Sequence, residues 1–390
     1  MPTDSMPTVL LVAHNYPPHI GGLELVVQKQ AESLVNSGYQ VVILTSRYAR
    51  VRDEERGSAG IEVVGVPCSH ILERIFNIPF PLFSISLIWR SWKFVRKVDV
   101  VHIHDVFYIS SWVTGTLALL LRKPMLVTQH VAMVDHPSKL VMLIQRFVFA
   151  TIGRWLFSRA RKIVVYNSNV QSFLQSTGVP LERILLISNG IDTAAFRPPA
   201  PDERFAIRQR FGLPQDRFLV LFVGRLVEKK GYHVLLDARD PSYDLVFAGP
   251  GPIPKAGRLD NVYWMGPMDQ GRAAELFRAC DLFAFPAIGE IFTLVMQEAM
   301  ASGLPIVTTD DPAYRGSVVS NCITVACRDG ASFRDALVRI LGDRSLMSRL
   351  REQSRCVAVQ NFDWRKNFLA LAALYSRILE KIPRPDSSAT

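Results

Sequence analysis

Short, almost continuous apolar runs recur along the first half of the chain, and segments with helical spacing separate them. After the first run, Leu23, Val26, Ala31 and Leu34 follow the 3.6-residue period, and Gly38 fits the end of that helix. Apolar runs without polar alternation are typical of parallel strands that are covered on both faces. The runs that predict strands span residues 8–14, 40–46, 61–67, 98–104, 124–130 and 162–168.

A second series of the same kind begins near residue 217. Its predicted strands span residues 217–224, 243–249, 261–266, 281–287, 304–310 and 322–327. Strands that alternate with helices in both series predict an α/β fold with two Rossmann-like, doubly wound domains. We expect the first domain over residues 1–195 and the second over 217–362, with the Pro-rich, charged segment 196–216 as a linker that holds a short helix. Ligands of such sheets bind beyond the carboxyl ends of the strands, so two facing domains would bind them in the cleft between.

The composition narrows the class of protein. Of the 390 residues 49% are hydrophobic, which suits packed cores, and the net charge is +10. A basic excess suits an anionic small ligand, an anionic membrane or nucleic acid. Nucleic acid fits least, because the basic residues are scattered and form no platform with aromatic residues. The five cysteines form no C-x-x-C pair and no signal peptide is evident, so neither a disulfide framework nor a zinc site is expected, and a reducing, cytoplasmic location fits.

Two stretches come close to a membrane-spanning composition without reaching it. Residues 75–97 are interrupted by Pro79, Pro81 and Arg90, and residues 139–162 carry basic residues along their length. No spanning helix is therefore expected. Both stretches suit amphipathic segments that lie on an anionic membrane, and they suit equally well buried helices of the first domain with a solvated basic edge.

Two cations follow a predicted strand of the second domain in GRLVEKKG, residues 224–231. Arg225 comes directly after the strand, and Lys230 stands just before the next helix. Cations at a strand end, beside a helix N-terminus, form an anion site. The alternative is a charged loop in solvent.

A pair of carboxylates marks the stretch GEIFTLVMQEAMASGLPIV, residues 289–307. Glu290 precedes an apolar helix and Glu298 lies inside it. If that helix starts near Phe292, backbone N–H groups of residues 292–294 would point at a phosphate. The carboxylates on either side would accept hydrogen bonds from the hydroxyls of a sugar and of a ribose. The alternative for Glu298 is a partly exposed helix position.

Candidate residues also follow the strands of the first domain. Gly21 and Gly22 form a turn where a ligand can approach the backbone, although the spacing G-x-G-x-x-G is absent. Histidines stand at strand ends at positions His14, His104 and His130, while His102 alternates with apolar residues and suits the core. No D-x-D sequence occurs and the histidines lack metal-ligand spacing, so we expect cationic side chains and a helix terminus in place of a metal.

These features follow one another in the order of a known family. The Gly-Gly turn, the histidine that ends strand 124–130, NGID at 189–192, the Arg225–Lys230 loop, GPGP at 249–252 and the Glu290–Glu298 pair resemble the retaining glycosyltransferases of family 4, which have the GT-B fold. The resemblance covers essentially the whole chain, and the E-x7-E pair followed by AMASGLPIV is its most specific part. It implies transfer of a sugar from a nucleotide diphosphate sugar with retention of configuration, without a metal or other cofactor.

The resemblance also implies roles for individual residues. His130 would lie near the transferred sugar, Arg225 and Lys230 would hold the diphosphate, Glu290 would contact sugar hydroxyls and Glu298 the ribose. The other donor-binding positions would be Gly21, Gly22, Gly249, Gly251, Met265, Gly266, Pro267, Ile291, Phe292, Thr293 and Leu294. Ile291 replaces a glycine that the family often has there, which leaves the identity of the sugar open. A C-terminal helix, residues 363–382, would cross back onto the first domain.

The expected function is therefore hexosyl transfer to a lipid-linked acceptor or a cell-surface glycan precursor, as in polysaccharide biosynthesis. The enzyme would be cytoplasmic and peripheral on the inner face of the membrane. Two alternatives stay open: a sugar-nucleotide epimerase of similar fold, and a non-catalytic, membrane-attached protein that binds nucleotide sugars.

Overall fold

The chain folds into two compact units. The computed structural model describes residues 6–19, 21–47, 54–56, 60–76, 80–133, 138–188, 190–252, 259–288, 293–310 and 319–380. The first unit comprises Met1–Ser188 together with Phe368–Thr390, and the second comprises Asn189–Asn367. The first unit is thus assembled from both ends of the chain.

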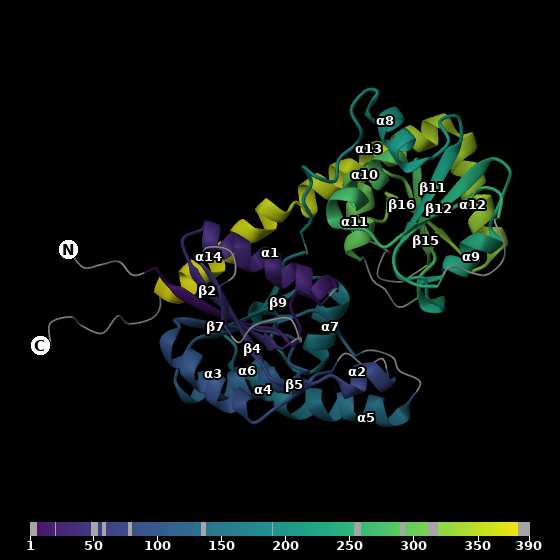
Figure 1. The fold of residues 1–390 in the computed structure, drawn as a ribbon. Coiled ribbons are helices and arrows are strands. Elements are labelled where there is room, and N and C mark those ends of the chain that lie inside the picture. The colour runs from purple at the N-terminus through teal and green to yellow at the C-terminus, as the bar shows by residue number, and fades with distance from the viewer. Residues whose placement is uncertain are drawn as a thin grey trace, which may run out of the picture. The chain divides into compact units, whose positions relative to one another are not determined.

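An eight-stranded sheet forms the centre of the first unit, with the strand order β10-β9-β8-β7-β1-β2-β4-β3 (Figure 1). Neighbouring strands are parallel except β3 and β4. The strands are β1 (Thr8–Val12), β2 (Gln40–Ser46), β3 (Glu54–Arg56), β4 (Ile61–Val66), β7 (Val100–His104), β8 (Met125–Gln129), β9 (Lys162–Val165) and β10 (Ile184–Leu186), and a separate antiparallel pair consists of β5 (Cys68–Ser69) and β6 (Leu82–Phe83). All six strands predicted in this half are confirmed, whereas β3, β5, β6 and β10 were not expected.

Helices cover both faces of this sheet. They are α1 (Gly22–Asn36), α2 (Ile71–Phe76), α3 (Ser86–Lys97), α4 (Ile109–Leu120), α5 (Lys139–Val148), the π-helical turn η1 (Phe149–Gly153), α6 (Arg154–Arg159), α7 (Ser168–Ser176), the 3₁₀ turn η2 (Leu181–Arg183) and α14 (Trp364–Glu380). On one face, Leu87 and Phe94 of α3 and Leu156 of α6 pack on the strands. On the other face, Val27 of α1 and Leu374 of α14 fill the core (Figure 1). Burial on both faces explains why the strands are apolar throughout.

A buried polar network fastens α14 to the sheet. The Tyr375 hydroxyl lies within hydrogen-bond distance of His102 Nδ1 and accepts from Gln30 Nε2 at 2.9 Å. His102 Nε2 lies 2.7 Å from the Thr128 hydroxyl, so the ring faces the core. Because each of these groups would be costly to bury alone, the network favours one position of α14 on the first unit.

The second unit is built on a six-stranded parallel sheet in the order β13-β12-β11-β14-β15-β16. Its strands are β11 (Phe218–Val223), β12 (Tyr243–Ala248), β13 (Val262–Gly266), β14 (Leu282–Phe285), β15 (Ile306–Thr309) and β16 (Ile323–Ala326). Its helices are α8 (Glu203–Phe211), the 3₁₀ turn η3 (Glu228–Lys230), α9 (Tyr232–Asp237), α10 (Gln270–Ala279), α11 (Leu294–Ala301), α12 (Gly330–Gly342) and α13 (Arg344–Asn361). The six predicted strands of this half are confirmed.

The segment 196–216 belongs to the body of the second unit. Phe196 is fully buried in the core of that unit, and α8 contributes Ile207 to it. Arg208 donates to Asp281 Oδ2 at 2.7 Å, and the same oxygen accepts the Leu219 N–H at 3.0 Å. The proline-rich stretch that reads as a linker is thus held by packing and by a buried ion pair.

Candidate active site

The carboxyl ends of β11, β12 and β13 meet through closely packed backbone. Gly249 follows β12 with a φ of 137°, and a Cβ there would lie 2.0 Å from the Gly224 carbonyl oxygen. Leu226 N–H donates to Pro250 O at 2.8 Å, and Gly249 N–H donates to Gly266 O at 2.9 Å. Gly249, Gly251, Met265 and Gly266, which the resemblance assigns to donor binding, therefore line one edge of the sheet, and Pro267 follows them on the surface.

The two predicted cations lie at this same edge. Arg225 is exposed directly after β11, and Lys230 Nζ lies 5.4 Å from the centre of the Phe285 ring of β14. Gly231 has a φ of 76°, and a Cβ there would lie 2.1 Å from Pro286 O. The loop that carries Lys230 is thus pressed against the end of β14, where the chain leads toward α11.

The helix after β14 begins later than expected. Thr293 has extended backbone (φ −68°, ψ 160°), so the first helical residue is Leu294 and not a residue near Phe292. The first amides of α11, at Leu294 and Val295, have no intrahelical acceptor and suit an anion. The Thr293 hydroxyl is buried and has no partner among the described residues. Residues Glu290, Ile291 and Phe292 lie outside the described residues, and their expected roles stay predictions.

Glu298 is a buried residue of α11. It is 8% exposed, so a partly exposed helix position, the alternative that the sequence left open, is wrong. Burial raises the pKa of its carboxyl group to about 7, and a hydrogen bond with the side chain of Gln270, the first residue of α10, opposes that shift. A carboxylate that is desolvated in the free protein gains strongly from hydroxyl donors supplied by a ligand.

Three histidines lie at the carboxyl ends of adjacent strands in the first unit. His14 follows β1, His104 ends β7 and His130 follows β8. His104 Nδ1 lies 3.0 Å from His130 Nε2, and the ring of His14 stacks on Tyr108 with 3.5 Å between centroids. Burial lowers the pKa of His14 and of His104 to about 3 and that of His130 well below 6.5. All three rings are therefore neutral near pH 7.

Asp105 is a residue of this cluster that the sequence did not single out. It follows β7 with a φ of 61°, and its Oδ1 accepts the His130 N–H at 2.8 Å. Burial raises the pKa of Asp105 to about 7, opposed by hydrogen bonds from the backbone N–H groups of His130 and Val131. In the sequence, Asp105 was marked only by its position directly after His104, at the end of a predicted strand. Asp105 fixes the backbone that carries His130.

The Gly-Gly turn brings an acidic side chain with it. Gly21 caps α1 and Gly22 begins it, and a Cβ on Gly21 would lie 2.2 Å from Glu24 Oε2. His19 Nδ1 lies 2.6 Å from Glu24, and His19 Nε2 lies 3.0 Å from Glu73. These two carboxylates raise the pKa of His19 to about 9, so this turn carries a protonated imidazole at neutral pH.

Two family models match the chain. One, described as Glycosyltransferase Family 4, matches residues 20–195, and the other, Glycosyl transferases group 1, matches residues 203–357. The chain belongs to the group 1 glycosyltransferases.

Relatives and solved structures agree with this assignment. The D-inositol 3-phosphate glycosyltransferase of Xylanimonas cellulosilytica is 26% identical over 93% of each chain. Sucrose-phosphate synthase of Thermosynechococcus elongatus superposes with a TM-score of 0.75 at 20% identity, covering 96% of this chain and all of the other. HepE of Anabaena, solved with UDP, superposes with a TM-score of 0.73 at 18% identity and covers 95% of this chain and all of its own. The two parallel-sheet units are those of the GT-B fold, as predicted.

Within each unit, the structure gathers the predicted residues at one edge of a sheet. In the second unit that edge carries Arg225, Lys230, the glycines predicted to bind the donor, Thr293 and Leu294, and the helix α11 that begins there contains Glu298. In the first unit it carries Gly21, Gly22 and His130 together with the unpredicted Asp105.

Proposed function

We propose that this glycosyltransferase moves a hexose from a nucleoside diphosphate sugar to an acceptor, with retention of anomeric configuration. The observation that carries the proposal is the buried, desolvated carboxyl of Glu298 inside α11, on the sheet that also presents Arg225 and Lys230. A diphosphate flanked by two sugars needs both cations and hydroxyl acceptors. HepE, a protein of similar fold, has been solved in complex with UDP-glucose, which is a nucleoside diphosphate sugar of this class.

The reaction that we propose is displacement of the nucleoside diphosphate. Negative charge develops on the departing phosphate oxygen, and Arg225, Lys230 and the first amides of α11 stabilise it. Glu298 accepts the ribose hydroxyls, Glu290 contacts the sugar, and neutral His130 offers the sugar a hydrogen-bonding nitrogen. The acceptor oxygen attacks from the face that the diphosphate leaves, and the leaving phosphate takes the acceptor's proton.

We also propose that the cations and the helix terminus replace a metal ion. Among the described residues, no group of three His, Cys, Asp or Glu side chains is placed to hold one. Turnover should then persist in EDTA. A loss of turnover that Mg²⁺ restores would contradict this part of the proposal while leaving sugar transfer intact.

A donor screen tests the function. UDP-, GDP- and ADP-sugars are added to the protein, and the melting temperature is measured. A donor at 100 times its dissociation constant adds roughly 2.7 kcal/mol to the free energy of unfolding. Product analysis with that donor then separates the candidates: transfer to an added glycan or lipid-linked acceptor supports the proposal, isomerised nucleotide sugar indicates an epimerase, and binding without turnover indicates a binding protein.

The acceptor that we propose is presented at an anionic membrane. Large apolar side chains project from α5, where Leu143 is 63% and Phe147 68% exposed, and from α3, where Trp89 is 66% exposed. Basic residues stand beside them, including Lys139 on α5 and Arg96 on α3. An amphipathic face of this composition suits insertion at a lipid interface.

The same region also raises the question of a spanning helix. Within the described part of the chain, the continuous helical run Lys139–Arg159 is long and apolar enough to cross a membrane by length and composition. Such a match is weak evidence, and the run carries Arg146 and Arg154. We propose that it lies on the surface of the membrane, where both side chains can reach the headgroups.

A further inference from the structure

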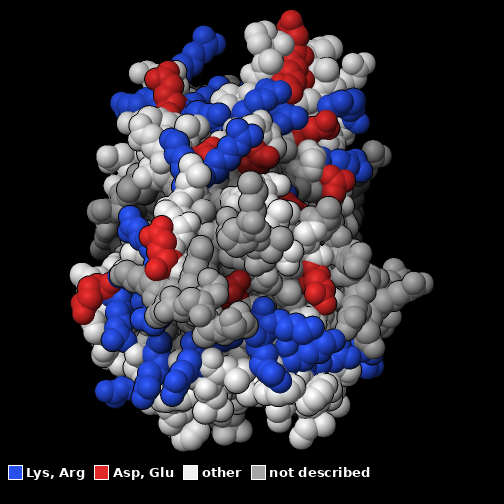
Figure 2. All heavy atoms as spheres, turned by 90° about the vertical axis from the view of Figure 1, so that its left-hand side faces the viewer, with Lys and Arg blue, Asp and Glu red and all other residues white. Residues whose placement is uncertain are grey.

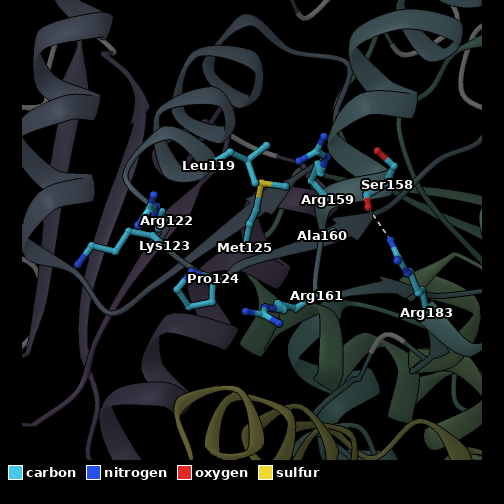
Figure 3. A pocket seen from close by; sticks show the side chains of 10 residues that line it. All are labelled: Leu119, Arg122, Lys123, Pro124, Met125, Ser158, Arg159, Ala160, Arg161 and Arg183. Atoms are coloured by element: carbon cyan, nitrogen blue, oxygen red, sulfur yellow. Dashed lines mark hydrogen bonds between the residues drawn. The ribbon is translucent and has the colours of Figure 1, made fainter. Parts of the chain in front are cut away.

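The first unit has an open pocket at the opposite edge of its sheet from the histidines. The pocket has a volume of about 460 Å³ and lies where β8 and β9 begin, with Met125 and Arg161 in its wall (Figure 3). His130 follows the other end of β8, five residues beyond Met125, or roughly 17 Å further along the chain at 3.3 Å per residue. The pocket is thus separate from the residues assigned to sugar transfer.

Cationic side chains dominate the lining of this pocket. They are Arg122, Lys123, Arg159, Arg161 and Arg183, and the wall contains no acidic side chain. Arg122 and Lys123 lie on one side of the pocket, Arg159 and Arg183 lie on the other, and Arg161 lies between them, turned toward Pro124 (Figure 3). A band of Lys and Arg side chains crosses the lower part of the view in Figure 2, where the first unit lies.

These cations lack the acidic partner that a cluster of arginines in the second unit has. There, Arg204, Arg208 and Arg351 all surround the carboxylate of Asp281. In the pocket, one of the five cationic side chains donates to a backbone carbonyl group: Arg183 Nη1 donates to Ser158 O at 2.5 Å. No ion pair within the described part of the chain neutralises any of the five. Like charges gathered without counterions repel one another, and a bound anion would remove that repulsion.

Helix dipoles account for only some of these positions. Arg122 comes shortly after the end of α4 and Arg159 is the last residue of α6, and a cation is favourable at a helix C-terminus. Arg161 follows the end of α6 by two residues and Arg183 is the last residue of the 3₁₀ turn η2, where a single turn has little dipole, and both residues immediately precede strands, β9 and β10. Their convergence with Arg122 on one pocket is not explained by the helix ends.

We propose that this pocket binds a phosphate-bearing anion. Guanidinium groups donate in pairs to phosphate oxygens, and a tetrahedral phosphate can accept from donors on several sides, as the arginines on both sides of the pocket provide. The volume falls within the range of about 300–1,000 Å³ that is typical of small-molecule sites, so it accommodates a phosphorylated organic group.

A second pocket next to the first indicates how the two sources of phosphate can be told apart. It has a volume of about 390 Å³, shares Arg161 with the first, and is lined by the apolar Leu185, Leu374 and Ile378 together with Lys162 and Arg377. A free phosphate compound would use only the basic pocket. A phospholipid would place its phosphate there and the first part of its acyl chain against the leucines.

The test is calorimetric titration of the full chain. All titrations use the background Arg225→Ala with Lys230→Ala, so that the donor site contributes little. The first probe is inorganic pyrophosphate and the second is dihexanoyl phosphatidic acid below its micellar concentration. The test variant adds Arg122→Asn and Arg161→Gln, of which asparagine suits the left-handed backbone at position 122. The matched control adds Arg344→Gln and Arg349→Gln, exposed positions on α13 that remove the same charge.

We expect the test variant to lose at least about tenfold in affinity for pyrophosphate, with the control unchanged. Equal affinities in the two variants, or no binding in the background protein, would overturn the proposal. Tighter binding of the phosphatidic acid that Leu185→Ser, at a partly buried position in the second pocket, abolishes identifies a lipid as the source, and equal binding of both probes identifies a free phosphate compound. Because the parent chain with Arg122→Asn and Arg161→Gln keeps the transfer machinery, its turnover reports separately on the proposed function.

Discussion

His104 Nδ1 lies 3.0 Å from His130 Nε2 in the first unit, and both rings are buried enough to be neutral. One nitrogen of the pair therefore donates a hydrogen and the other accepts it, so the tautomer of one ring determines that of the other. The remaining nitrogen of His130 is left to interact with other groups. In the reaction that we propose, this pair supplies a neutral imidazole to the transferred sugar.

Replacing His130 should therefore slow the chemical step. We expect His130→Ala to lower turnover by about 100-fold or more, the usual scale for a positioned hydrogen-bonding catalyst. The affinity for the nucleotide should stay within about twofold, because the cations that we propose to hold the diphosphate, Arg225 and Lys230, belong to the second unit. Steady-state kinetics with the best donor and titration with its nucleoside diphosphate measure the two effects. Unchanged turnover in a folded variant would remove His130 from the site.

Glu298 and Glu290 should separate binding from transfer. Glu298→Ala removes the buried acceptor for ribose hydroxyls, and a hydrogen bond to a charged group is worth about 1.5–3 kcal/mol, or roughly a 10- to 100-fold loss in nucleotide affinity. Glu290→Ala should instead reduce turnover at nearly normal nucleotide affinity. Titration and kinetics on both variants decide the matter, and wild-type values for both quantities in both variants would refute the assignment.

The raised pKa of Glu298 predicts how stability changes with pH. The carboxyl has a pKa of about 7 when folded and 4.5 in its unperturbed state, so the folded protein binds more protons than the unfolded one between those values. Below about pH 4.5 this carboxyl group does not lower the free energy of unfolding. As the pH rises through 7, burial of the ionised group lowers that free energy by about 3 kcal/mol. Glu298→Gln should therefore raise the melting temperature more at pH 8 than at pH 5. An equal shift at both values would show that the buried charge carries no such cost.

The exposed face of α5 should carry membrane attachment. We expect Leu143→Glu with Phe147→Glu to prevent flotation with vesicles that contain anionic lipid, because apolar insertion is lost and negative charge is added. The control is Phe205→Glu with Leu369→Glu, two exposed apolar positions on α8 and α14. High salt should weaken flotation of the parent protein only in part, since insertion resists screening. Flotation by neither protein, or loss in both variants alike, contradicts the proposal.

Much of the fold could be read from the sequence because its determinants are local. Strands that are buried on both faces must be apolar throughout, and so the runs at 8–14 and 217–224 were sufficient to place β1 and β11. The segment 196–216 was harder to interpret. Its prolines and charges are typical of a linker. Contacts between residues far apart in sequence, such as Arg208 with Asp281 and Phe196 with the core, show that it is part of the second unit.

The site was predictable in its residue types but not in its environment. Position after a strand sufficed to propose Arg225, Lys230 and His130. The burial of Glu298 depends on the packing of α11 against its neighbours, which no spacing rule contains. Asp105 was missed because its role depends on the backbone of His130, brought beside it by the pairing of β7 with β8.

The position of α14 has a consequence for synthesis on the ribosome. The helix closes one face of the first unit with Leu374, Tyr375 and Ile378, which follow the whole second unit in the chain and are translated after it. The second unit, a continuous stretch ending at Asn367, can complete its core while the first is still uncovered. The first unit, whose synthesis begins first, is thus the last to complete its core. A chain that stops short of α14 would leave the apolar face of the first unit exposed and dependent on chaperones.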